Sequence, residues 1–174
     1  MFYGHSDVPL ADEGVGDIKA RSSKGLYPDP KEAEYFTSGL IRTEQTLSLI
    51  YGDVPHTRLD SLKEIDFGDY EFKTHNELKK DPAYLSWLSD ESGLSAPHGG
   101  ENFAEFAARV NAGFLSVLES NAEHSVIVCH GGVICVIMDS CFDGIFTNRF
   151  QWLPEPGHGY TVAFDGDPQE YTAF

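Results

Sequence analysis

The sequence has few basic residues and no long apolar run. Its 174 residues include 12 lysines and arginines against 28 aspartates and glutamates, which gives a formal net charge of −16. Such an acidic chain is repelled by the phosphates of nucleic acids and by anionic membrane surfaces, so we expect neither as a partner. No apolar stretch approaches the roughly 18 residues of a membrane-spanning helix. A phosphorylated ligand would need a local group of basic side chains, because the remaining surface repels it.

Cysteines are also scarce, and segments that would divide the chain are missing. Cys129, Cys135 and Cys141 all lie in or beside one apolar segment. An odd number of cysteines in a core segment indicates reduced thiols and a cytoplasmic protein rather than a disulfide framework. The sequence contains no linker, internal repeat or low-complexity tract, so residues 1–174 are expected to form one domain.

Several motifs of known catalytic chemistries are absent. The segment Gly4-His5-Ser6-Asp7-Val8 lacks the last glycine of a G-x-S-x-G elbow, which excludes the α/β-hydrolase interpretation. No cysteine is followed six positions later by arginine, so the chain has no cysteine-phosphatase loop. A P-loop and a C-x-x-C pair are missing too. The histidines never stand at the i, i+4 spacing of a helical zinc site, and we expect no bound metal.

What the sequence does contain is an alternation of strand and helix patterns. Strands are expected near residues 34–37, 58–61 and 126–129, and helices near 11–24, 40–51, 74–80, 82–89 and 102–120. The helix at 102–120 has the clearest signal, because its apolar residues recur at i, i+3, i+4 and i+7. Residues 160–164 and 170–172 predict a closing hairpin. The pattern as a whole indicates one α/β layer sandwich.

The segment that organises the rest is Val126-Ile127-Val128-Cys129-His130-Gly131-Gly132-Val133. Its apolar first half predicts a strand buried on both faces, and the apolar run 133–138 predicts a buried helix. The break between them places His130 at the carboxyl end of the sheet, beside the free N–H groups of a helix, where an anion is favoured. Gly131 and Gly132 would let a ligand approach the backbone. The alternative is a core histidine beside a tight turn, and the glycines favour the site.

Three further segments could carry chemistry. Arg42 follows a predicted strand and opens a helix that Ser38 is expected to cap, so it should lie at the same sheet edge as His130. The alternative is an exposed arginine in the first helical turn. Segment 62–71 packs four acidic residues among apolar ones, and a partly buried carboxyl there could hold a proton for a leaving group. A solvated acidic loop is the alternative. Residues 3–7 form the third segment, for which a simple loop is the alternative.

Together with Gly100-Glu101-Asn102-Phe103 and Arg109, these segments resemble in order and spacing the histidine phosphatase superfamily, the phosphoglycerate-mutase-like group. The resemblance implies a three-layer α/β sandwich around a mostly parallel sheet with a C-terminal hairpin. It also implies phosphoryl transfer through a phosphohistidine on a small phosphorylated substrate, without a metal or an organic cofactor. The short chain favours a phosphatase over a mutase, and its loops resemble the α-ribazole-phosphatase-like branch. Oligomerisation stays open.

The resemblance assigns roles to individual residues. His130 would be the second active-site histidine, Arg42 a phosphate-clamping arginine, and Glu64 the proton donor. Positions expected to line the substrate are Tyr3, Gly4, Phe67 and Gly131.

The chain also departs from the family pattern. The family begins with a strand that ends in Arg-His-Gly, which supplies the nucleophilic histidine and the other phosphate-clamping arginine, and no such motif is present. The spacing to Asp7-Val8-Pro9-Leu10 and Gly14 places Tyr3-Gly4-His5-Ser6 downstream of that motif. We therefore expect a late-called start or a truncation, with a non-catalytic pseudophosphatase as the alternative. The missing strand is central in the family, so its neighbours should have unpaired backbone groups.

Overall fold

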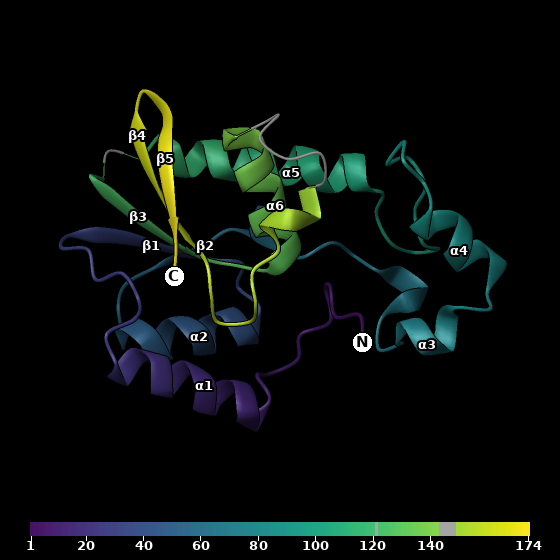
Figure 1. The fold of residues 1–174 in the computed structure, drawn as a ribbon, viewed down its shortest axis with the longest axis horizontal. Coiled ribbons are helices and arrows are strands. Elements are labelled where there is room, and N and C mark those ends of the chain that lie inside the picture. Colours follow the sequence, from purple (N-terminus) through teal and green to yellow (C-terminus); the bar gives the residue numbers. More distant parts are fainter. Residues whose placement is uncertain (121, 143–148) are drawn as a thin grey trace.

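The computed structural model describes residues 1–120, 122–142 and 149–174 (Figure 1). The helices of these ranges are α1 (Asp12–Ser23), α2 (Ile41–Tyr51), α3 (His75–Leu78), α4 (Pro82–Leu88), α5 (Phe103–Leu118) and α6 (Gly131–Cys141), with 3-10 turns at Asp60–Leu62, Gly68–Tyr70 and Arg149–Trp152. The strands are β1 (Ala33–Thr37), β2 (Thr57–Arg58), β3 (His124–Val128), β4 (Tyr160–Asp165) and β5 (Asp167–Ala173). Within the described ranges, no helix combines the length and apolar character needed to cross a bilayer.

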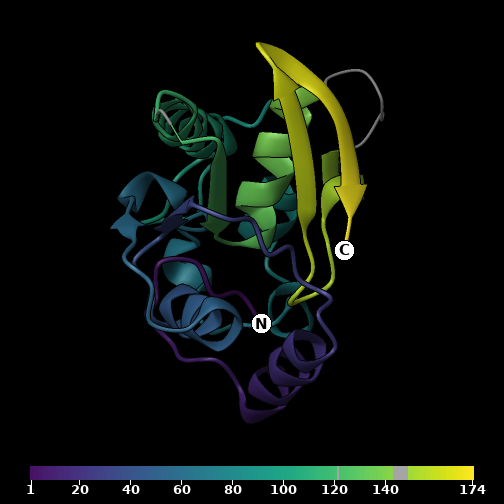
Figure 2. The ribbon, with the colours of Figure 1, turned by 90° about the vertical axis from the view of Figure 1, so that its left-hand side faces the viewer.

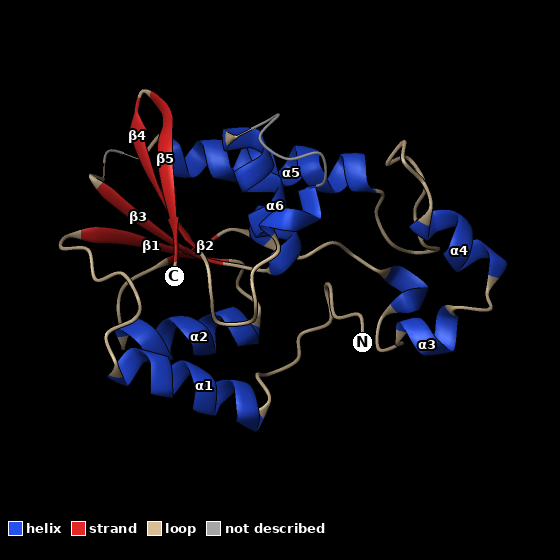
Figure 3. Cartoon of the chain, in the orientation of Figure 1, coloured by secondary structure: helices blue, strands red, loops and turns tan. Residues whose placement is uncertain are grey.

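A parallel sheet forms the middle layer. Its strand order is β2-β1-β3, with Phe36 opposite both Thr57 of β2 and Ile127 of β3. Helices α1 and α2 lie on one side of this sheet, and α5 and α6 lie on the other (Figures 1 and 3). The predicted α/β architecture is confirmed. Parallel strands end at a common edge, so the loops after β1 and β3 are brought together there.

The predicted C-terminal hairpin is confirmed as a second, separate sheet. Strands β4 and β5 pair antiparallel, and Gly166 makes the turn with a φ of +77°. Figure 2 shows the hairpin beside α6. The contact is apolar, because Tyr160 and Val162 of β4 pack against the buried cluster of Cys135, Met138 and Trp152.

Strand β3 is less buried than its sequence predicts. We expected both faces to be covered, but Val126, Ile127 and Val128 are only partly buried. Within the described residues β3 pairs only with β1, and β4 pairs only with β5. Each of these two strands therefore has one edge whose backbone groups lack a neighbouring strand. Strands β2 and β5 also lie at the ends of their sheets, so the loss of a central strand stays a prediction.

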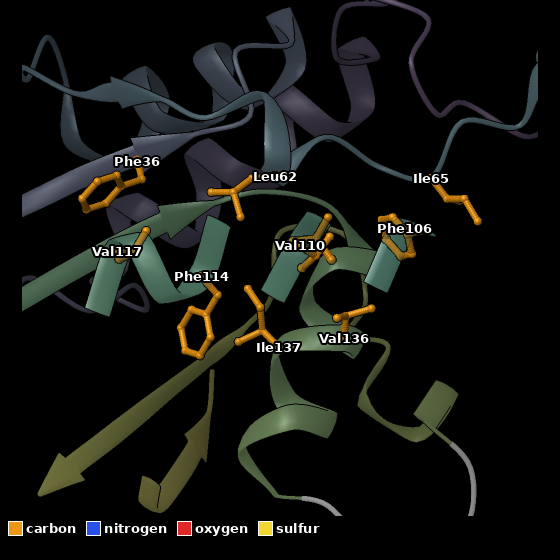
Figure 4. Packing of buried hydrophobic residues seen from close by; sticks show 10 residues of the cluster. Phe36, Leu62, Ile65, Phe106, Val110, Phe114, Val117, Val136 and Ile137 are labelled. Atoms are coloured by element: carbon orange, nitrogen blue, oxygen red, sulfur yellow. The ribbon is translucent and has the colours of Figure 1, made fainter. Parts of the chain in front are cut away.

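The main core lies between α5, α6 and the sheet. Phe106, Val110 and Val117 of α5 are almost completely buried and belong to one cluster with Val136 and Ile137 of α6 (Figure 4). The 3.6-residue periodicity of the α5 segment produces this apolar face. Helix α5 begins at a capping box, in which the Asn102 side chain accepts from the Glu105 N–H and the Glu105 carboxylate accepts from the Asn102 N–H. This packing fixes α6 and hence the residues at its first turn.

The second predicted strand is shorter than expected. Residues 58–61 were expected to be extended, whereas β2 ends at Arg58 and the chain turns through Asp60–Leu62. The turn directs Leu62 into the core, where it is 0% exposed. Burial of this side chain outweighs continuation of a strand at the sheet edge.

Candidate active site

The loops that follow β1 and β3 meet at the carboxyl edge of the parallel sheet. His130 stands between β3 and α6 and is 8% exposed, and Arg42 lies in the first turn of α2. The Arg42 Nε–H donates to His130 Nδ1 at 3.3 Å. The two residues are far apart in sequence and meet because β1 and β3 are neighbouring parallel strands.

Glu64 reaches the same place from the irregular segment before α3. Its carboxylate accepts hydrogen bonds from the N–H groups of Gly132 and Ile65, each at 2.9 Å. Burial raises the pKa of this carboxyl above its ordinary value, against the opposing effects of the two N–H donors and of the positive charges on Arg42 and Arg109. Such a group holds its proton to higher pH than a solvated glutamate does. The structure thus brings the three predicted catalytic residues together.

The glycine at position 132 is required by this arrangement. A Cβ on Gly132 would collide with the carboxylate of Glu64. Gly131 is equally constrained, because a Cβ there would come within 2.6 Å of Leu153 Cδ1. The space beside Gly131 and Gly132, which the sequence suggested for a ligand, is therefore occupied by Leu153 and Glu64.

The environment of His130 keeps the imidazole neutral. Burial lowers its pKa to about 3, and the positive charges of Arg42, Arg109 and His5 act in the same direction. Both ring nitrogens have partners, since Nε2 lies 2.8 Å from the hydroxyl of Ser38. His130 is thus a neutral, fully hydrogen-bonded side chain.

Backbone of the N-terminal segment lies across Arg42. The guanidinium donates to the carbonyls of Ser6 at 2.9 Å and Gly4 at 2.7 Å, and more weakly to that of Tyr3. The carboxylate of Glu71 holds this segment by accepting from the N–H groups of Gly4 and His5. Tyr3 and Gly4 therefore reach the site through their main chain. An incoming anion would have to displace these carbonyls from Arg42.

The other predicted substrate-lining residue, Phe67, has a packing role. Its ring lies 4.8 Å from that of Phe2 and 6.2 Å from that of Trp87, in a satellite cluster around the buried Tyr84. The ring of Tyr3 likewise packs edge-on against Phe72, at 5.6 Å. These aromatic contacts attach the N-terminal segment to the loop that carries Glu64.

Arg109 organises that loop, a role that sequence reasoning did not assign. Its guanidinium donates to the carbonyls of Ser61, Lys63 and Glu64 and forms a bidentate ion pair with Glu101. Three carbonyls that point at one cation fix the backbone on which Glu64 stands. The available signal was the presence of Glu101 and Arg109 in the same family-like motif.

Ser38 does not cap α2 as predicted. The N-cap position is Leu40, without a side-chain cap, and the Ser38 hydroxyl faces His130 instead. A serine two residues before a helix has the sequence signature of a cap, and only the neighbouring strand reveals its actual partner.

A family model for the histidine phosphatase superfamily (branch 1) matches residues 1–172. The chain belongs to this superfamily. It is 31% identical over 144 residues to an adenosylcobalamin/alpha-ribazole phosphatase of Salmonella typhimurium, covering 79% of this chain and 69% of the relative. It is also 32% identical over 149 residues to a 2,3-bisphosphoglycerate-dependent phosphoglycerate mutase of Beijerinckia indica, covering 75% of this chain and 68% of the relative.

Solved structures agree with this membership. The alpha-ribazole phosphatase of Shigella flexneri superimposes with a TM-score of 0.81 at 22% identity, over 95% of this chain and 83% of that one. A phosphoglycerate mutase of Thermus thermophilus gives 0.71 at 27% identity, over 99% and 89%. The former supports the fold alone. The predicted family is confirmed, and its members similar to this chain are phosphatases and phosphoglycerate mutases.

Two further features of the described residues concern Cys129 and the grouping of possible metal ligands. Burial raises the pKa of the Cys129 thiol to about 12, so this neighbour of His130 stays protonated. Across residues 1–120, 122–142 and 149–174, no three His, Cys, Asp or Glu side chains are grouped as metal ligands are.

Because His130 is buried in its neutral form, we expect the folded protein to lose stability in acid. The folded-state pKa near 3 lies below the ordinary 6.5, so the unfolded chain binds the proton first. The contribution of neutral His130 to the free energy of unfolding is fully present above pH 6.5. It is lost as the pH falls toward 3, by about 1.4 kcal/mol per pH unit within that window. Urea unfolding across this range should show a shallower pH dependence in His130→Gln than in the wild type. His98, with a 91% exposed side chain, provides the control His98→Gln. Parallel curves for the wild type and His130→Gln would contradict the prediction.

Proposed function

We propose that this chain carries the phosphate-clamping and proton-donating groups of a histidine phosphatase that hydrolyses a small phosphomonoester through a phosphohistidine. The observation that carries the proposal is the meeting of Arg42, His130 and Glu64. Arg42 Nε is 3.3 Å from His130 Nδ1, and the Glu64 carboxyl contacts the N–H of Gly132, two residues from His130. A cation, an imidazole and a carboxyl with a raised pKa are groups that phosphoryl transfer to water uses in addition to the attacking nucleophile.

Each group has a distinct chemical task in this proposal. Arg42 and the N-terminus of α6 supply positive charge for the oxygens of the phosphoryl group. Glu64 holds a proton that it gives to the departing alkoxide, and it then accepts one from the water that hydrolyses the phosphohistidine. His130 engages the phosphoryl oxygens, and Arg109 keeps the Glu64 loop in position.

We propose further that the 174 residues as written do not turn over a substrate, because none of the residues that the structure describes is placed to attack phosphorus. His130 is buried and bonded at both nitrogens. His5 is partly exposed, but its ring lies 3.4 Å from Asp66 and 3.9 Å from Glu101, and these carboxylates repel a phosphate dianion. The alternative role is that of a phospholigand-binding or regulatory pseudophosphatase, which would use the same clamp without catalysis.

The substrate class follows from the relatives and from the charge of the chain. Similar proteins include alpha-ribazole phosphatases and phosphoglycerate mutases, which supports a small phosphorylated metabolite as ligand. The net charge of −16 disfavours larger polyanions. The free cysteines agree with a reducing, cytoplasmic setting.

Binding of inorganic phosphate or vanadate tests the clamp in the chain as it stands. Arg42→Ala should weaken binding about tenfold or more, because a charge-assisted hydrogen bond contributes about 1.5–3 kcal/mol. Arg58, whose side chain is 66% exposed and pairs with Glu44, provides the control Arg58→Ala. Calorimetric titration with vanadate would measure both variants. Equal weakening by the two substitutions would show that Arg42 acts only through the general charge of the surface.

A further inference from the structure

A chain of buried hydroxyl groups lies behind His130. The Thr43 hydroxyl donates to the Leu40 carbonyl at 2.8 Å, which uses its only proton. The contact of 3.1 Å between the Ser38 and Thr43 hydroxyls must therefore have Ser38 as donor. Ser38 is 0% exposed and Thr43 is 2% exposed, so both hydroxyls are shielded from solvent.

The direction of these bonds fixes the proton on His130. Because the Ser38 hydroxyl donates its proton to Thr43, the Ser38 oxygen can only accept a hydrogen bond from His130 Nε2 at 2.8 Å. Nε2 must then carry the hydrogen. The contact at Nδ1 leads to the same tautomer. The Arg42 Nε–H can only donate, so Nδ1 must accept with a lone pair and carries no hydrogen. Two independent contacts thus specify one tautomer.

We propose that Ser38 and Thr43 are positioning residues that hold His130 as the Nε2–H tautomer, so that Nδ1 is the atom that accepts a proton when a phosphate monoanion binds. The tautomer half of the inference concerns the chain alone. The proton-acceptance half rests on the proposed function.

The proton transfer balances within the site. The O–H bond of the phosphate monoanion breaks, its proton forms an N–H bond at Nδ1, and a phosphate dianion remains beside an imidazolium. Arg42 leaves Nδ1 for a phosphate oxygen, and the new Nδ1–H donates to another oxygen. The Nε2–H group keeps its hydrogen bond to the Ser38 hydroxyl throughout, so the imidazole ring does not have to rotate.

The charged groups around the ring make this uptake dependent on the anion. Arg42 of α2, Arg109 of α5 and His5 of the N-terminal segment all disfavour a second proton on the ring. The Glu64 carboxyl accepts a hydrogen bond from the N–H of Gly132, two residues after His130. A bound phosphate would add the negative charge that offsets the three basic side chains.

Long-range proton–nitrogen NMR on the chain with nitrogen-15-labelled histidine reports the tautomer directly. The His130 signals are identified by their loss in His130→Gln. The wild type should show the Nε2–H pattern. Ser38→Ala leaves the longer Arg42 contact of 3.3 Å to favour Nε2–H, so the Nδ1–H population should rise, and Ser38→Thr, which keeps the hydroxyl, should restore the pattern.

Thr43 offers a second, isosteric pair of variants. Thr43→Val removes the acceptor of the Ser38 proton, so Ser38 becomes free to donate to Nε2, and the Nδ1–H population should rise. Thr43→Ser should keep the wild-type pattern. A role in packing alone predicts the opposite ranking, because valine preserves the shape of threonine and serine does not. Unchanged signals from the other histidines show that each variant is folded.

Two outcomes would overturn the first half of the inference. One is an Nδ1–H pattern in the wild type, which contradicts the Nε2–H tautomer. The other is an unchanged Nε2–H pattern in folded Ser38→Ala and Thr43→Val, which contradicts its control by Ser38 and Thr43. Titration with inorganic phosphate tests the second half, since the Nδ1 signal should move to the protonated position as phosphate binds. Binding without this movement would overturn the proton acceptance by Nδ1. Absence of phosphate binding would contradict both the proton acceptance by Nδ1 and the proposed function, and it would not affect the tautomer result.

Discussion

Fusion of a strand ending in Arg-His-Gly ahead of Met1 is expected to raise hydrolysis of p-nitrophenyl phosphate at least about a thousandfold over the 174-residue chain. A strand and loop with the Arg-His-Gly pattern of the family can serve as donor. The added histidine supplies an in-line nucleophile, and the added arginine supplies a second positive group for the phosphoryl oxygens. Turnover of the chimera beside the unmodified chain measures the effect, and acid-labile phosphohistidine identifies the intermediate.

A matched chimera separates the nucleophile from the strand that carries it. Glutamine in place of the added histidine should leave hydrolysis near the level of the 174-residue chain. Both chimeras should melt at a higher temperature than that chain, because the added strand can pair with edges that β3 and β4 leave open. If the unmodified chain hydrolyses p-nitrophenyl phosphate as fast as the active chimera, a residue within 1–174 is the nucleophile. His5 and His130 are then the side chains to trap as phosphohistidine.

The parts of the fold that sequence reasoning located are those set by local periodicity. The apolar repeat of α5 and the His-Gly-Gly break after β3 depend on neighbouring residues, and both lie where they were predicted. The meeting of Arg42 with His130 was predictable as well, because any two adjacent parallel strands end at the same edge of their sheet.

What the sequence did not reveal depends on packing between distant segments. Ser38 has the local pattern of a helix cap, but its hydroxyl bonds to a residue 92 positions away. The glycines after His130 indicated room for a ligand, whereas one of them makes room for Glu64. The carbonyls of Tyr3, Gly4 and Ser6 that accept from Arg42 have no signal in the sequence, because every residue has a carbonyl.

Glu64→Gln in the active chimera should lower turnover of an alkyl phosphate by about a hundredfold to ten-thousandfold, the range of general acid catalysis. An alkoxide is a poor leaving group and needs the proton that the buried carboxyl holds. The p-nitrophenolate ion is stable without protonation at neutral pH. The loss with p-nitrophenyl phosphate should therefore be much smaller, and the ratio of the two kcat/KM losses is the quantity to measure.

The substrate dependence distinguishes proton donation from a structural effect. Glutamine cannot donate a carboxylic proton, yet it keeps the shape of Glu64 and one oxygen for the N–H of Gly132 or Ile65. Any distortion of the α6 N-terminus would weaken phosphate binding and slow both substrates alike. Glu105→Gln, at the exposed start of α5, removes one acidic group away from the site and should slow neither substrate. Equal losses on both substrates in Glu64→Gln would assign Glu64 to positioning the helix rather than to protonating the leaving group.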